Sequence, residues 1–226
     1  MHAALQSVIM AIDEAKKSGL TIEWILILDR VDHSTRNYLH THKPASANFV
    51  EVNLGDAGLA RNHGTPLSSG QFISFIDAGD FWSPNWLTEA HSFARSQSSP
   101  KVIFHSHINL LLGRQNSVMA ALDSESSSFS KTMLFRKNCW TPSPFARREI
   151  YLDYPYASLE PEKGFAYADW HWNCETLAAG IAHKIVPDTF HCYSKPAPDQ
   201  LPPEHVEEGP GVIRPSKLFA LAYQHG

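Results

Sequence analysis

Two spacings of apolar side chains organise the first half of the chain. In residues 3–17 apolar positions recur every three or four residues, the pattern of an amphipathic helix, and Gly19 follows as its stop. Residues 22–28 are almost continuously apolar, as expected of a strand that is covered on both faces of a sheet. The pattern therefore predicts a helix followed by a buried strand.

The same alternation of helix and strand continues along the chain. We expect further helices at residues 59–62, from Ser83-Pro84, at 169–179 and near 216–223, and further strands at 48–52, 72–76, 101–106, 133–136, 185–186 and 190–193. Strands that alternate with helices predict an α/β domain with a largely parallel sheet. Ligands of such sheets bind at the carboxyl ends of the strands.

Carboxylates gather where two of these strands end. Asp29 and Asp32 follow the first strand, and Asp77 and Asp80 follow the strand at 72–76. Carboxylates that share one edge of a sheet repel each other unless a cation or hydrogen-bond donors lie between them. A divalent cation that bridges to phosphates is one solution, and a simple turn built on Asp and Gly is the alternative.

Two more segments carry candidate chemistry. Arg61 and Asn62 lie among glycines, where a guanidinium can make paired hydrogen bonds to a base or a phosphate, or can be a solvated helix residue. The glycines match neither a dinucleotide-binding fingerprint nor a Walker loop. Asp169 falls in the first turn of its helix, where an ionised carboxylate is favoured and can act as a general base. Taken alone, a helix cap is the simpler role for it.

The composition narrows the class of protein. The 226 residues are 43% hydrophobic, enough for a sizeable core, and the net charge of −4 gives no electrostatic footprint for nucleic acid. The apolar runs are too short to span a bilayer, and the start lacks the basic region of a signal peptide. Three widely spaced cysteines fit a reducing compartment. We therefore expect a cytoplasmic protein, and peripheral association with the inner face of a membrane stays open.

The thirteen histidines form no zinc motif. His105 and His107 would project from one face of a strand, but the sequence offers no nearby third ligand. His191 follows the helix of Asp169 and could reach the same cleft, although a structural role is the simpler interpretation.

Four segments, in this order, resemble the family 2 glycosyltransferases, which have the GT-A fold. Residues 23–35 resemble a strand and an Asp-Asp-Gly-Ser-Thr turn, residues 58–64 a Gly-x-x-x-Arg-Asn-x-Gly stretch, residues 72–82 a strand with an Asp-x-Asp-Asp metal motif, and residues 165–170 a Glu-Asp-Trp segment. The resemblance implies a GT-A-like, mostly parallel α/β domain over residues 1–195. A proline-rich extension with a final helix would follow over residues 196–226.

The resemblance also implies a reaction. A sugar would move, with inversion, from a UDP-linked nucleotide-sugar donor to a saccharide or lipid-linked acceptor, and a divalent cation (Mn²⁺ or Mg²⁺) would bind the diphosphate. The residues that match the family's motifs would be Asp169 as catalytic base, Asp32, Arg61 and Asn62 at the nucleotide, Asp77 and Asp80 at the metal, and Trp82 in the sugar pocket.

Three departures from the family pattern leave alternatives open. Gly79 stands where the family has the metal-motif Asp nearest the metal, and Ala168 replaces the Glu before the base. The chain also opens in the helix that follows the family's first, central strand, and without that strand backbone groups of the sheet would be unpaired. We therefore expect a truncated start. The alternative function is a non-catalytic domain that binds a nucleotide or a saccharide; a nucleotidyltransferase is a third class, but no basic, glycine-rich triphosphate loop supports it.

Overall fold

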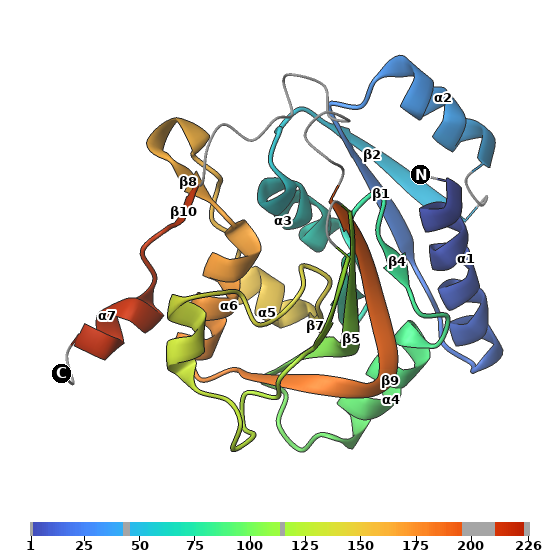
Figure 1. The fold of residues 1–226 in the computed structure, drawn as a ribbon. Helices are drawn as coiled ribbons and strands as arrows, with labels where there is room; N and C mark the ends of the chain where they lie inside the picture. The colour runs from blue at the N-terminus through green and yellow to red at the C-terminus, as the bar shows by residue number, and fades with distance from the viewer. Residues whose placement is uncertain (1, 43–45, 114–115, 196–210, 224–226) are drawn as a thin grey trace.

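Two long parallel strands form the centre of the computed structural model, which describes residues 2–42, 46–113, 116–195 and 211–223 (Figure 1). β5 (Val102–Gly113) pairs with β9 (Ala182–Lys195) along most of its length. Short strands extend this sheet in the order β3-β7-β5-β9-β4, and β6 pairs with β5 off that path. The bounds of the short strands are Phe72–Ser74 (β3), Phe81–Trp82 (β4), Ser117–Ala120 (β6) and Phe145–Arg147 (β7).

A second, two-stranded sheet holds the first predicted strand. β1 (Trp24–Asp29) pairs in parallel with β2 (Ala47–Val52), and over the described residues neither strand is hydrogen-bonded to the large sheet. Only Leu28 of β1 is buried, although the apolar sequence predicts cover on both faces. β1 and β2 therefore form a sheet of their own, next to the place where the sequence predicts a missing central strand.

The fold class predicted from the sequence is confirmed. The longer pairings, β1 with β2 and β5 with β9, are parallel, whereas every pair that β3, β4, β6 or β7 makes is antiparallel. The result is a mixed α/β domain in which the long strand pairs are parallel and the short ones of the large sheet antiparallel. The predicted positions of the strands at 22–28, 48–52, 72–76 and 101–106 agree with β1, β2, β3 and β5 to within a few residues, except that β5 runs on to Gly113.

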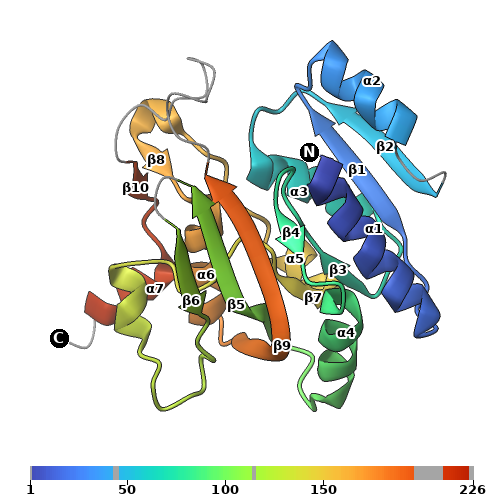
Figure 2. The same cartoon turned by 45° about the vertical axis from the view of Figure 1, so that its right-hand side comes forward.

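Helices cover both faces of the large sheet (Figure 2). Successive residues of β5 point to opposite faces: Val102 and Phe104 join the apolar cluster of α1 and α4, and Ile103 joins that of α5 and α6. α3 packs against β1 and α5. The helix bounds are His2–Lys17 (α1), His33–His42 (α2), Ala57–Leu67 (α3), Trp86–Ser96 (α4), Arg148–Asp153 (α5) and Ala168–Ala178 (α6).

One of the predicted strand assignments is wrong, and two others are parts of one longer strand. Residues 133–136 lie largely in the 3₁₀ helix η1 (Lys131–Phe135), in which Leu134 is fully buried, so the short apolar run came from a helical turn. Residues 185–186 and 190–193 belong to the single strand β9. The irregularity at Asp188, whose φ is 56°, faces a register shift in β5 and does not end the strand.

The helix predicted from Ser83-Pro84 begins later, at Trp86. Ser83 instead ties β4 to β9, because its N–H donates to the Phe190 carbonyl and its hydroxyl accepts from the Phe190 N–H. The backbone at Asn85 takes the cap position of α4 without a side-chain hydrogen bond.

The C-terminal residues 211–223 pack against the rest of the domain. β10 (Val212–Ile213) pairs with β8 (Phe165–Ala166), which follows the 3₁₀ helix η2 (Pro161–Lys163), and α7 (Lys217–Tyr223) packs on α6. The predicted final helix is thus confirmed, whereas residues 196–210 of the proline-rich extension lie outside the described residues. Within the described ranges, no helix combines the length and the apolar character that crossing a membrane requires.

Candidate functional site

A buried arginine joins two of the predicted acidic residues. Arg61, on α3, is only 6% exposed, and its Nη2 donates to Asp77 Oδ1 at 2.6 Å. Its Nη1 donates to Asp169 Oδ1. Asp77 follows β3, the element next to α3 in the chain, whereas Asp169 lies in the first turn of the distant α6, so three elements meet at one guanidinium.

Aromatic rings and an amide hold Arg61 in place. Its guanidinium carbon lies 5.2 Å from the centre of the Tyr156 ring and 5.9 Å from that of Phe75. Asn62 fixes Tyr156 in turn, since its side-chain amide donates to the Tyr156 carbonyl at 2.8 Å and accepts from the Tyr156 N–H at 2.9 Å. The predicted nucleotide-binding residue Asn62 is therefore engaged with backbone in this structure.

The ionisation of this group follows from its burial. Burial alone would lower the pKa of Arg61, but the carboxylates of Asp169 and Asp77 raise it well above its ordinary value. Burial raises the pKa of Asp169 despite the neighbouring guanidinium. Asp169 is not the helix cap, because Tyr167 occupies the cap position of α6 with a left-handed backbone (φ 62°). A carboxylate of raised pKa that is still 28% exposed is suited to accept a proton from a bound substrate.

Asp80 makes a second polar pair. Its Oδ2 lies 3.0 Å from Nε2 of His191, a residue of β9 that is 1% exposed, and among the described residues the Nδ1 of that ring has no hydrogen-bond partner. The sequence favoured a satisfied structural role for His191. Its position next to a predicted metal residue depends on the pairing of β4 with β9, for which the sequence carries no signal.

The residues present fit an open metal site better than a closed one. In the part of the chain that the structure describes, no group of three or more His, Cys, Asp or Glu converges on one point. Mg²⁺ and similar cations are often held by one or two protein carboxylates together with substrate phosphates, and Asp80, whose Oδ2 is paired with Nε2 of His191, can supply one such carboxylate.

Gly79, the position at which the resemblance implies a carboxylate, has an unusual backbone conformation. Gly79 has a φ of +128°, a backbone conformation that residues with a side chain rarely adopt, although space for a Cβ is free. The loop between Asp77 and Asp80 is therefore built around glycine.

Trp82 lies in the core. It is 6% exposed, joins the apolar cluster of α1 and α4, and donates its indole N–H to the Ser143 hydroxyl at 2.8 Å. The predicted place of Trp82 in a sugar pocket would require an open face, which this packing does not provide.

The acidic residues that follow β1 form a separate group. Asp29 accepts hydrogen bonds from the backbone N–H groups of Leu54, Gly55 and Asp56 at 2.7, 2.9 and 3.1 Å. Burial opposes ionisation there, but these donors hold the pKa of Asp29 below its usual value. Asp32 accepts from the Ser34 hydroxyl and the Thr35 N–H, both at 2.7 Å, at the start of α2.

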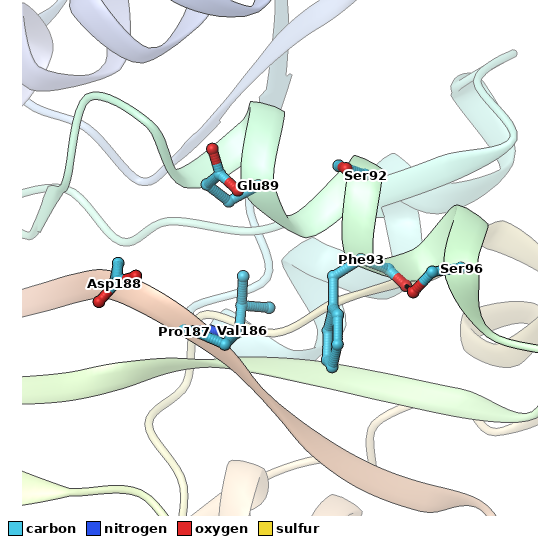
Figure 3. Close-up of a pocket in the computed structure, with 7 residues that line it drawn as sticks. All are labelled: Glu89, Ser92, Phe93, Ser96, Val186, Pro187 and Asp188. Carbon is cyan, nitrogen blue, oxygen red and sulfur yellow. Dashed lines mark hydrogen bonds between the residues drawn. The ribbon is translucent and has the colours of Figure 1, made fainter.

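A shallow hollow of about 230 Å³ lies between α4 and β9, lined among others by Glu89, Phe93 and Asp188 (Figure 3). None of the predicted site residues lines it. The arrangement of Arg61, Asp77 and Asp169 is therefore the candidate site on chemical grounds rather than on shape.

Comparisons with known proteins agree on the fold. No protein-family model and no curated protein matches the sequence. Among solved structures, S. aureus TarS (residues 1–349) in complex with UDP-GlcNAc has a TM-score of 0.64 at 14% identity and covers 96% of this chain. GalNAc-T7 with UDP, GalNAc and Mn²⁺ has a TM-score of 0.57 at 12% identity and covers 88%. The chain spans 61% of the TarS structure and 43% of the GalNAc-T7 structure. The likeness shows that this chain shares the GT-A-like α/β fold of these structures.

Proposed function

We propose that this chain is a glycosyltransferase that uses a nucleotide-sugar donor, with UDP as the nucleotide. The observation that carries the proposal is the Arg61 bridge, because it sets Asp169, a carboxylate of raised pKa, beside the acidic strand end at Asp77. A likeness to structures with UDP bound supports a nucleoside diphosphate donor.

In the proposed reaction, Asp169 takes the proton of an acceptor hydroxyl. The hydroxyl oxygen forms a bond to the anomeric carbon of the sugar, the bond from that carbon to the diphosphate breaks, and UDP leaves with the bonding electrons. Attack opposite UDP inverts the anomeric centre. The acceptor in this proposal is a saccharide or a lipid-linked molecule, and the three free, buried cysteines support a cytoplasmic setting.

A divalent cation would supply Lewis-acid stabilisation of the departing diphosphate. Asp80 would hold it together with the diphosphate oxygens, with His191 fixing the Asp80 carboxylate, while Asp77 remains paired with Arg61. Asp32 would contact the nucleotide base.

A non-catalytic domain that binds a nucleotide or a saccharide is the second candidate. The break between β1 and the large sheet favours it. A nucleotide site beside two sheets that are not hydrogen-bonded to each other has a less rigid frame.

Thermal unfolding of the purified chain tests the proposal. UDP and UDP-GlcNAc are added with and without Mn²⁺, and ATP serves as the control nucleotide. A ligand present at about 100 times its Kd stabilises a protein by about 2.7 kcal/mol, which is visible as a rise in Tm. We expect a Mn²⁺-dependent rise with UDP, and release of UDP from UDP-GlcNAc with water in the place of the acceptor hydroxyl. A rise without turnover would favour the second candidate, and no response to either UDP ligand would contradict the proposal.

A further inference from the structure

We propose that Arg61 is a positioning residue, which fixes the Asp169 carboxylate relative to Asp77, and that it does not contact the nucleotide base. This inference rests on the proposed function, since it names how the catalytic base of that reaction is held. It departs from the role that the resemblance gives to Arg61.

The guanidinium of Arg61 is already bound to two carboxylates. Both terminal nitrogens of Arg61 already donate to carboxylates, one to Asp77 and one to Asp169. The side chain is 6% exposed, with aromatic rings within 6 Å of its guanidinium carbon. Three of the five N–H groups of the guanidinium make neither of these bonds, but the burial of the side chain leaves little surface at which a base or ribose could reach them.

The residues that surround Arg61 form a rigid frame. The Tyr156 ring stacks on Trp172 of α6 at 5.0 Å between ring centres, and the backbone of Tyr156 is held by Asn62, the neighbour of Arg61. α3 and α6 are therefore linked twice, once through this stack and once through the ion pair of Arg61 with Asp169. Such a double link sets the direction in which the Asp169 carboxylate points.

The consequence is catalytic rather than only structural. A general base must lie within hydrogen-bond reach of the proton it takes, and a displacement of about 1 Å can cost about 100-fold in rate. Asp77 lies at the strand end where the donor would bind, so the shared guanidinium keeps the base at a set place beside the donor.

The test compares Arg61→Lys with Arg36→Lys. Lys keeps the charge but cannot donate to two carboxylates with a fixed fork. Arg36 is the matched control, because it makes a two-point contact with Glu51 at the surface, at 3.0 and 2.9 Å. We expect kcat for UDP release from UDP-GlcNAc to fall about 100-fold in Arg61→Lys, with the Kd for UDP unchanged. Arg36→Lys changes neither.

Two results would overturn the inference. A loss of UDP affinity in Arg61→Lys that accounts for its loss of turnover would assign Arg61 to the nucleotide, and an unchanged kcat would remove the positioning role.

A second measurement reads the contact itself and needs no turnover. Urea unfolding of Arg61→Lys, Asp169→Asn and the double variant should give non-additive losses, since the two residues share one interaction. Additive losses would overturn the inference. Failure of the unchanged protein to bind UDP would count against the proposed function, while this cycle still tests whether Arg61 and Asp169 interact in the folded protein.

Discussion

The two groups of carboxylates at the strand ends differ in what satisfies them. After β1, Asp29 is held by three backbone N–H groups of one loop, and Asp32 by neighbours at the start of α2. Asp77 and Asp169 are held by one buried guanidinium from a third element. The difference separates a carboxylate that builds a loop from one that is kept partly free for chemistry.

This difference has a physical basis. Three backbone donors bind both oxygens of Asp29 and keep its pKa low, so it stays a fixed anion. Asp169 accepts from Arg61 through Oδ1 and is partly exposed, and burial raises its pKa toward the range in which a base can take up a proton.

Removal of the guanidinium should give the largest effect. Arg61→Met leaves two carboxylates without their cation, and we expect a loss of about 3 kcal/mol in the free energy of unfolding, at the low end for a buried pair because Asp77 is 46% exposed. Urea unfolding measures it. Arg36→Met, which removes a surface ion pair, should cost no more than about 1 kcal/mol. Equal losses in the two variants would contradict the view that the buried pairs of Arg61 contribute more to stability than the surface pair.

The dependence of stability on pH should show a contribution from a buried histidine pair that is distinct from those of the two carboxylate groups. His105 Nε2 lies 2.9 Å from His183 Nδ1, and burial lowers the pKa of His183 to about 3 and that of His105 well below its usual value. Both rings are therefore neutral in the fold, and their stabilisation is complete above pH ~6.5.

As the pH falls from about 6.5 toward 3, each of these rings should cost up to about 1.4 kcal/mol per pH unit. The urea midpoint at pH 7 and pH 5 measures the loss. His183→Gln should reduce this pH dependence, and an unchanged dependence would show that the loss arises elsewhere.

Asp29→Asn tests the loop-building group. An amide has one carbonyl oxygen in place of the two that accept from Leu54, Gly55 and Asp56, so we expect a loss of about 1–2 kcal/mol at pH 7. Because the pKa of Asp29 is lowered, this stabilisation is present above pH ~4 and is lost as the pH falls through the folded pKa. Equal stability of the two proteins at pH 7, measured by urea unfolding, would contradict this account of Asp29.

Gly79→Asp should give the smallest loss. At a φ of +128° a side chain strains the backbone, and we expect a cost of about 1 kcal/mol in thermal unfolding. The added carboxylate should not strengthen the response to Mn²⁺, since the strained loop must first rearrange. A stabilised variant with a stronger Mn²⁺ response would show that the loop accepts an acid there.

The sequence alone could predict the order of elements and the places where acids gather, because both depend on local periodicity and on residues that follow apolar runs. It could not predict that Arg61 and Asp169, which are 108 positions apart, form an ion pair. Single-sequence patterns carry no information about such pairing. Trp82 shows the same limit, since its place in the core depends on the contact of β4 with β9.

The most direct test of the proposed chemistry is the comparison of unchanged protein with Asp169→Asn. UDP release from UDP-GlcNAc and the Kd for UDP are measured on the same samples. We predict that Asp169→Asn binds UDP with unchanged affinity and loses turnover, because the amide cannot take the acceptor proton. Turnover of Asp169→Asn at the rate of the unchanged protein would contradict the assignment of Asp169 as the base.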